Sequence, residues 1–136
     1  MQISGISNVK DISSGTAYNC ATKNDLSLWC WGDNISGQLG RGTRWQKDPQ
    51  TGYLVPNPDE YIPQAVTGFA NTAQVATTYR STCAAQTNGS LYCWGWDVYR
   101  QLGQGGVFDE IYIEIIPAQT NHDKLVPTIV PNINVN

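Results

Sequence analysis

The sequence has few charged residues, and its basic residues do not cluster. Asp, Glu, Lys and Arg make up 14% of the 136 residues, and the formal net charge is −3. Nucleic-acid binding depends mainly on Lys and Arg that neutralise phosphates, and anionic membrane surfaces attract the same side chains. We therefore expect neither a nucleic acid nor a membrane as the partner of this protein.

Long apolar runs and a secretory signal are also lacking. No run approaches the length of a transmembrane helix, and Met1–Gly5 has neither a basic start nor an apolar stretch. No segment combines a helical period with capping residues. What the sequence does contain is 5 Trp, 7 Tyr and 13 Gly, against only 2 Phe and 1 Met. Together with the plentiful Thr, Ser and Asn, this composition favours β structure.

An internal repeat decides the organisation of the chain. Residues 5–42 align with residues 68–105 without a gap, and both Cys-Trp-Gly and Gln-Leu-Gly occur twice at this offset. A third copy begins at Pro127–Val130, which matches Pro63–Val66. Because a repeat sets the architecture before local structure does, we expect one domain over residues 1–136. It is divided into two repeats, about 3–66 and 66–130, with inserted loops at 43–62 and 106–126.

Short segments with strand character recur in each repeat. Four short strands per unit is the pattern of a propeller blade, so the predicted fold class is all-β: two tandem four-stranded propeller-like blades, an incomplete propeller. Gly89 is suited to positive φ in the second hairpin turn, whereas Leu26 stands at the matching place in the first, so we expect the two turns to differ. The expected strands are Val9–Ser13, Thr16–Thr22, Leu26–Trp31, Gln64–Thr67, Gln74–Thr77 and Pro127–Val130.

One family shows this motif. Cys20-Ala21, followed by Leu28-Trp29-Cys30-Trp31-Gly32-Asp33-Asn34 and Gly37-Gln38-Leu39-Gly40, resembles the repeat of the regulator of chromosome condensation. The cysteine-bearing form is similar to secreted bacterial and viral members of that family. The second repeat departs from the motif, since Trp96-Asp97 replaces Asp33-Asn34 and Arg100 replaces Gly37. The resemblance implies a β-propeller whose faces bind proteins, as in exchange factors for small GTPases and an inhibitor of β-lactamases.

Two blades alone cannot close a propeller ring. Unclosed blades present sheet edges that pair with other strands, and repeat units need neighbours to bury their faces. We therefore expect other copies of the chain, or other proteins of an assembly, as partners. At least one terminal segment, Gln2–Ser4 or Thr128–Val130, is expected to pair with a sheet of another subunit. The alternative is that the two termini pair with each other within one chain.

The four cysteines form two evenly spaced pairs, Cys20 with Cys30 and Cys83 with Cys93. If each pair faces across its hairpin, the two cysteines come close enough for a disulfide. The alternative is reduced cysteines packed as small hydrophobes; zinc is disfavoured by the spacing and by the presence of one His. Disulfides predict an oxidising location, extracellular or on a virion surface. Either a leader is removed, or the protein oxidises after release from a cytoplasm.

The repeats disagree most in the two inserted loops. Loops of such length are usually functional or involved in contacts, although both loops can also simply pack on their own blades. Ile111–Ile116 has the signal of a strand that could extend a neighbouring sheet. Trp31 and Trp94 are predicted to be structural. The candidate binding residues are the aromatic ones of the loops and their surroundings: Trp45, Tyr53, Tyr61, Trp96, Tyr99, Phe108 and Tyr112.

No catalytic site emerges from the sequence. His122 lies in a polar stretch, and the pairs Asp59-Glu60 and Asp109-Glu110 are predicted to be solvated loop charges rather than a glycosidase pair. We expect no catalytic residue, no metal, no cofactor and no enzymatic activity. The predicted function is that of a structural or decoration protein of an extracellular assembly, such as a virion. The alternative is a protein- or carbohydrate-binding module, of inhibitor or adhesin type, that uses its aromatic loops.

Overall fold

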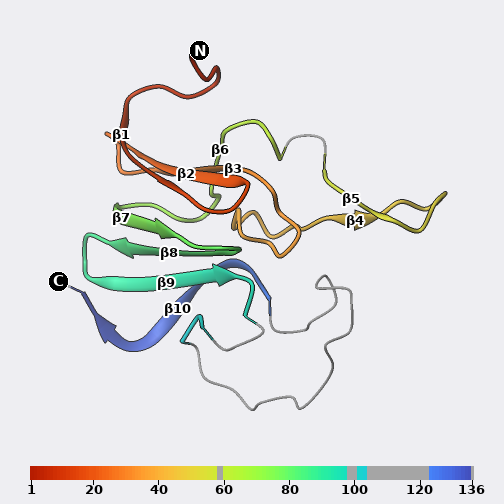
Figure 1. Cartoon of the computed structure of the whole chain (residues 1–136). Coiled ribbons are helices and arrows are strands. Elements are labelled where there is room, and N and C mark those ends of the chain that lie inside the picture. Colours follow the sequence, from red (N-terminus) through yellow and green to blue (C-terminus); the bar gives the residue numbers. More distant parts are fainter. Residues whose placement is uncertain (58–59, 98–100, 104–122, 136) are drawn as a thin grey trace.

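A computed structural model describes residues 1–57, 60–97, 101–103 and 123–135 (Figure 1). These residues form strands, turns and loops, and none of them lies in a helix that could cross a membrane. The strands are β1 (Val9–Ser14), β2 (Tyr18–Lys23), β3 (Leu28–Gly32), β4 (Gln46–Lys47), β5 (Leu54–Val55), β6 (Gln64–Ala65), β7 (Thr72–Thr77), β8 (Ser81–Gln86), β9 (Ser90–Gly95) and β10 (Lys124–Asn134).

Two four-stranded antiparallel sheets lie one on the other, as Figure 1 shows. The first sheet has the order β1-β2-β3-β6, and the second has the order β7-β8-β9-β10. Each sheet uses one repeat and closes with a strand that follows a long excursion. This arrangement confirms the predicted pair of four-stranded blades. In the first excursion, β4 and β5 form a separate two-stranded hairpin that projects from the blade.

The C-terminal strand corrects one expectation. Thr128 and Ile129 of β10 pair with Cys93 and Tyr92 of β9 in the same chain. The strand thus completes the second blade, as β6 completes the first by pairing with β3. The prediction that Thr128–Val130 pairs with another subunit is therefore wrong: the open edge of β9 lies within reach of its own chain. At the other end, Gln2–Ser4 forms no strand.

The two hairpin turns are alike, contrary to expectation. Leu26 has φ of 66°, and Gly89, its counterpart, has φ of 88°. Both residues donate their backbone N–H across the turn, Leu26 to Lys23 O and Gly89 to Gln86 O, each at 2.9 Å. A left-handed conformation is costly for a residue with a Cβ. The strands on either side impose the turn, and Leu26 adopts it despite its side chain.

Both disulfides join neighbouring strands within one hairpin. Cys20 of β2 is opposite and bonded to Cys30 of β3, and Cys83 of β8 is opposite and bonded to Cys93 of β9. The registers place Thr22 opposite Leu28, as the spacing predicts. Each disulfide therefore fixes the register of the central hairpin of its blade.

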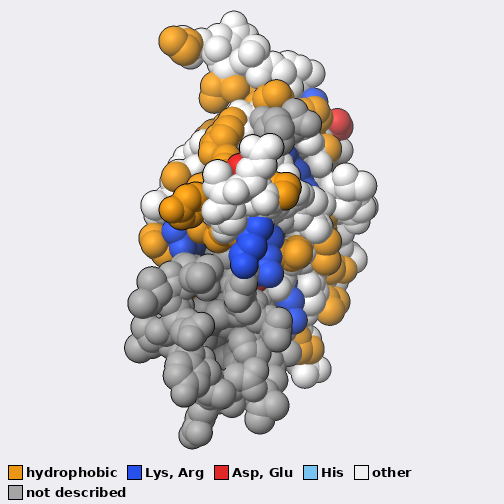
Figure 2. All heavy atoms as spheres, turned by 90° about the vertical axis from the view of Figure 1, so that its right-hand side faces the viewer, with side chains coloured by type: hydrophobic (Ala, Val, Ile, Leu, Met, Phe, Trp, Pro, Cys, Tyr) orange, Lys and Arg blue, Asp and Glu red, His pale blue; other side chains and the backbone are white. Residues whose placement is uncertain are grey.

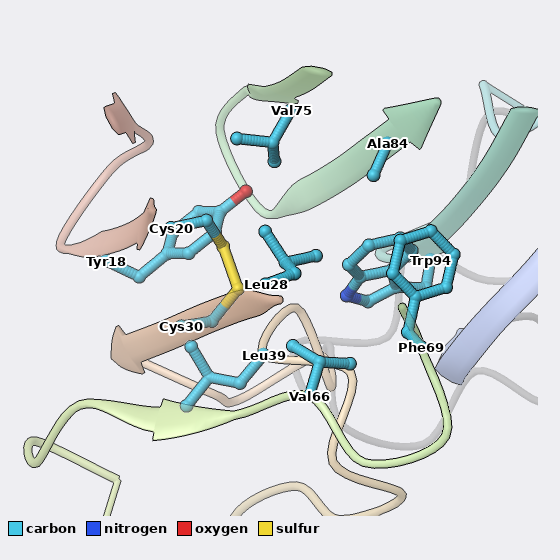
Figure 3. Close-up of a cluster of buried hydrophobic side chains, with 10 residues drawn as sticks. All are labelled: Tyr18, Cys20, Leu28, Cys30, Leu39, Val66, Phe69, Val75, Ala84 and Trp94. Atoms are coloured by element: carbon cyan, nitrogen blue, oxygen red, sulfur yellow. A yellow bond between two sulfur atoms is a disulfide. The ribbon is translucent and has the colours of Figure 1, made fainter. Parts of the chain in front are cut away.

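The core lies at the junction between the two blades (Figure 3). The side chains that face each other there come from both sheets and include the first disulfide. Trp94 of β9 is fully buried, and its ring packs against Phe69 with the ring centroids 5.8 Å apart. The buried residues are Tyr18, Cys20, Leu28, Cys30, Leu39 and Val66 on the first blade side, and Phe69, Val75, Ala84 and Trp94 on the second. A single apolar junction thus holds the two blades together.

Hydrogen bonds across the junction fix how the blades meet. Trp94 Nε1 donates to Gln38 O at 2.9 Å, and Thr82 Oγ1 donates to the same carbonyl at 2.8 Å. Gly40 lies against the indole, because a Cβ there would stand 2.7 Å from Trp94 Nε1. The Gln-Leu-Gly motif is therefore structural: its glutamine carbonyl and its glycine receive the tryptophan of the next blade.

Tyr18 crosses the junction in the opposite direction. Its hydroxyl donates to Ser81 O at 2.6 Å, and its oxygen lies 3.1 Å from Thr82 Oγ1. Burial disfavours the phenolate and raises the pKa of Tyr18 from 10.0 to about 12, although the Thr82 hydroxyl partly opposes this shift. The neutral phenol is thus the form that joins the blades.

Alkaline titration tests this role of Tyr18. Between pH 10 and 12 the unfolded chain releases the Tyr18 proton while the folded chain keeps it, so the folded state loses stability as pH rises. We expect a loss of about 2 kcal/mol over this window, measured by urea unfolding at each pH. Tyr18→Phe should cost about 1 kcal/mol at neutral pH and flatten the alkaline loss. An equally steep loss in Tyr18→Phe would show that another group causes it.

Candidate interaction surfaces

A buried polar side chain holds the Gln-Leu-Gly turn of each repeat. In the first blade, Asn34 Oδ1 accepts the backbone N–H of Leu39 at 3.1 Å. In the second, Asp97 Oδ1 accepts the N–H of Leu102 at 3.0 Å. The change from Asn to Asp, which departs from the motif, thus preserves the acceptor and the turn. These residues support the blade junction and do not form a reactive site.

Glu60 corrects the expectation of a solvated acidic pair. Its side chain is 1% exposed, and Oε1 accepts from Asn34 Nδ2 at 3.1 Å and from Asn57 Nδ2 at 3.3 Å. Burial raises the pKa of this carboxyl, and the two amides partly counter it. The carboxyl is buried because it fixes the end of the first excursion against the Asn34 turn. Asp59 lies outside the described residues.

Charged side chains link the blades at the polar edge of the junction. Arg80 Nε lies 3.9 Å from Asp33 Oδ2, whose other contact is the Gln38 amide at 2.9 Å. Arg44 Nη1 lies 3.9 Å from Asp123 Oδ2. Figure 2 shows Lys and Arg side chains gathered near the middle of this face, between separate groups of hydrophobic side chains. These long ion pairs align the blades and add little stability.

The first excursion exposes two of the predicted binding aromatics. Tyr53 beside β5 is 75% exposed and Tyr61 is 57% exposed. Trp45 is half-buried, and its Nε1 is shielded from solvent without a hydrogen-bond partner in the described structure. The excursion is therefore an ordered hairpin with aromatic side chains on its surface, rather than a plain loop.

A second aromatic group lies at the start of β8. Tyr79 and Trp96 meet edge to face with ring centroids 5.8 Å apart, and the Arg80 guanidinium lies 4.9 Å from the Tyr79 ring centroid. Tyr79 is 53% exposed. Trp96 was predicted as a candidate, but Tyr79 was missed. The available signal was a difference between the repeats inside an otherwise aligned block, since Thr16 stands at the position that matches Tyr79.

The other predicted positions are not described. Tyr99, Phe108, Tyr112, the segment 111–116, His122 and the pair at 109–110 all lie outside the described residues, as does most of the expected loop 106–126. The last residues of that expected loop, from Lys124 onwards, belong to β10. In the described part of the chain, no group of three or more His, Cys, Asp or Glu side chains is placed to hold a metal ion.

The outward face of each sheet carries residues at the same repeat positions as residues that pack in the junction. Ile12 is 52% exposed on the first blade, whereas Val75, its counterpart in the junction, is 6% exposed. On the second blade, Cys83 and Leu91 are half-buried, whereas Cys20 and Leu28, their counterparts in the junction, are fully buried. We call the outward sides of the two sheets the end faces of the chain, the Trp31 face of the first blade and the Leu102 face of the second, although Trp31 is 7% exposed and Leu102 is 1% exposed.

Comparison with known proteins identifies the repeat. Residues 27–85 match the model of the regulator of chromosome condensation (RCC1) repeat. Among curated proteins, the ultraviolet-B receptor UVR8 of Arabidopsis thaliana is 30% identical over 115 residues, which cover 83% of this chain and 23% of UVR8. The human E3 ubiquitin-protein ligase HERC2 is 29% identical over 102 residues, 72% of this chain and 2% of HERC2. The chain thus spans at most about a quarter of these relatives.

Solved structures show the same architecture. A chain in the crystal structure of Kap60 bound to yeast RCC1 (Prp20) superposes with a TM-score of 0.70 at 20% identity, covering 96% of this chain and 26% of that one. The crystal structure of human WBSCR16 gives a TM-score of 0.60 at 17% identity, covering 91% and 25%. The chain therefore shares the fold of about a quarter of each of these two larger chains. None of these relatives is bacterial or viral, and the matches support placing the chain in the propeller family built from the RCC1 repeat.

Proposed function

We propose that this chain is a non-catalytic structural module of an extracellular assembly that acts through protein–protein contacts. One observation carries this proposal: the apolar pattern of the blade junction recurs on both end faces, where Ile12, Cys83 and Leu91 are more exposed than their counterparts in the junction. Each end face thus carries one side of an interface like the one between the two blades. Exposed apolar side chains at positions that pack in the junction favour contact with another protein.

The two disulfides support the extracellular part of the proposal. All four cysteines are bonded, and disulfides persist in oxidising surroundings. The relatives supply support of a different kind. UVR8 is named a receptor, and yeast RCC1 is seen bound to Kap60, so repeats of this type occur in proteins that contact other proteins. HERC2 is a ligase as a whole protein, of which this chain matches 2%.

The Tyr79 group favours a second function, that of a binding module. An exposed aromatic side chain beside an arginine is a composition typical of binding hot spots. In that case the chain binds a different protein through Tyr79, Trp96 and Arg80, and its end faces contribute nothing.

Light scattering of the oxidised chain separates the two functions. We expect the molar mass to rise with concentration above the 14.9 kDa of one chain, and we expect Tyr79→Ala to leave this rise unchanged. A mass that stays at one chain up to high concentration would contradict the structural function. A rise that Tyr79→Ala abolishes would favour the binding surface over the sheet faces.

A further inference from the structure

We propose that Asn88, in the turn between β8 and β9, is an N-glycosylation site that accepts an oligosaccharide. The sequence contains the acceptor pattern Asn-X-Ser/Thr twice, at Asn34-Ile35-Ser36 and at Asn88-Gly89-Ser90. The pattern alone does not distinguish the two asparagines, but the structure does. This proposal rests on the extracellular part of the proposed function, because the modification requires passage through a secretory compartment.

The folded structure closes Asn34 to a glycan. Its side chain is fully buried, and its Nδ2 donates to Thr43 O at 2.9 Å and to Glu60 Oε1 at 3.1 Å. Nδ2 is the atom to which the sugar would be attached, and these two bonds use both of its hydrogens. A bulky oligosaccharide at this atom would displace the side chain that holds the Gln-Leu-Gly turn. We therefore expect folded chains to carry no glycan at Asn34.

Asn88 has the exposure and the local geometry of an acceptor. Its side chain is exposed in the hairpin turn, and its Oδ1 accepts the backbone N–H of Ser90 at 2.9 Å. This local bond engages the amide oxygen and leaves Nδ2 out of it. In the transfer, Nδ2 forms a bond to the anomeric carbon of a lipid-linked oligosaccharide. The bond from that carbon to the lipid diphosphate breaks, and one amide proton passes to solvent.

The first hairpin provides a matched comparison within the same chain. Asp25 and Ser27 stand where Asn88 and Ser90 stand in the second hairpin. Asp25 is also exposed, and its Oδ1 accepts the backbone N–H of Ser27 at 3.0 Å. At the acceptor position the two turns therefore differ in one atom, since Asp25 has a carboxylate oxygen in place of the amide nitrogen. Asp25→Asn is expected to create a second acceptor.

The Asn88 turn lies on the side of the molecule away from the β4–β5 hairpin (Figure 1). It borders the C-terminal strand, since Val135 N donates to Gly89 O at 2.9 Å. Tyr79 precedes β8 and Asn88 follows it, so the six residues of this strand separate them. An N-linked oligosaccharide is bulky and solubilising. A glycan at Asn88 would keep this end of the blade in solvent and leave Tyr53 and Tyr79 accessible to a partner.

Peptide mapping of the secreted chain tests the site. The full chain, directed into a eukaryotic secretory pathway by a cleavable leader, is expected to carry a glycan at Asn88 and none at Asn34. Ser90→Ala should abolish the glycan without changing the circular dichroism, because it removes only the hydroxyl of the pattern. Asp25→Asn should add a glycan in the first hairpin. Enzymatic removal of each glycan converts its asparagine to aspartate, which mass spectrometry detects.

A secreted, folded chain without a glycan at Asn88 would overturn the proposal, as would a glycan at Asn34 in the folded chain. A glycan at Asn88 that persists in Ser90→Ala would show that the pattern does not determine the site. Light scattering separates this proposal from the proposed function. An unglycosylated chain whose molar mass still rises with concentration would overturn the glycosylation site alone. A chain glycosylated at Asn88 that stays monomeric would support the site and contradict the proposed function.

Discussion

Replacing Trp94 by alanine is expected to lower the free energy of unfolding by about 3–5 kcal/mol, the range for removing a buried aromatic side chain. Trp94 is fully buried, packs against Phe69 and donates the hydrogen bond to Gln38 O. Its loss opens a cavity between the blades and leaves that carbonyl with the Thr82 hydroxyl alone. Urea unfolding followed by tryptophan fluorescence and circular dichroism measures the effect.

Trp31→Ala is the matched control, because it removes the same side chain from the same position of the other blade. Trp31 is 7% exposed, but it does not belong to the buried cluster at the junction. Measured at a concentration where the chain is monomeric, Trp31→Ala should therefore cost clearly less than Trp94→Ala. Equal losses would contradict the account of the junction as the stabilising contact between the blades.

Removing the first disulfide is expected to cost about 3–5 kcal/mol, and removing the second about 2–3 kcal/mol. Each bond joins residues 10 apart in sequence, so the restriction of the unfolded chain is the same for both. The difference comes from packing. Cys20 and Cys30 are both fully buried in the junction, whereas Cys93 is 3% exposed and Cys83 is half-buried on an end face. Replacing both first-pair sulfurs by hydrogen therefore leaves the larger cavity.

The pairs Cys20→Ala/Cys30→Ala and Cys83→Ala/Cys93→Ala allow the comparison by urea unfolding under oxidising conditions. The unmodified chain with reductant serves as the control for losing both bonds at once. An unchanged stability after reduction would show that the hairpins hold their register without the bonds. A greater loss for the second pair would contradict the central place of the first pair in the core.

The sequence predicts the fold well because each structural signal occurs twice, once in each repeat. Cysteines of matching spacing determine the hairpin register, and the two copies of Gln-Leu-Gly mark the turn that receives the next blade. The prediction of different turns was wrong at Leu26 because propensity is a local preference. The flanking strands, the disulfide and the backbone hydrogen bond to Lys23 together overcome the unfavourable φ of a single residue.

The interaction surfaces were harder to predict from the sequence. Exposed aromatics such as Tyr53 could be found as differences between repeats, but Tyr79 lies within an aligned block and was missed. The sequence also offered no means to see that Glu60 is buried, because its partner Asn34 lies 26 residues away along the chain. The end faces consist of positions that recur in both repeats, and only the exposure of residues such as Ile12, at 52% against 6% for Val75, distinguishes an end face from the packed junction.

Side-chain footprinting with hydroxyl radicals tests most directly whether the sheet faces make the contacts. The labelling of each residue would be compared between dilute and concentrated protein. The account predicts that labelling of Ile12, Trp29 and Leu91 falls with concentration, while labelling of the exposed Tyr53 and Tyr79 stays constant. Protection of Tyr53 and Tyr79 with unchanged labelling of Ile12 would contradict it.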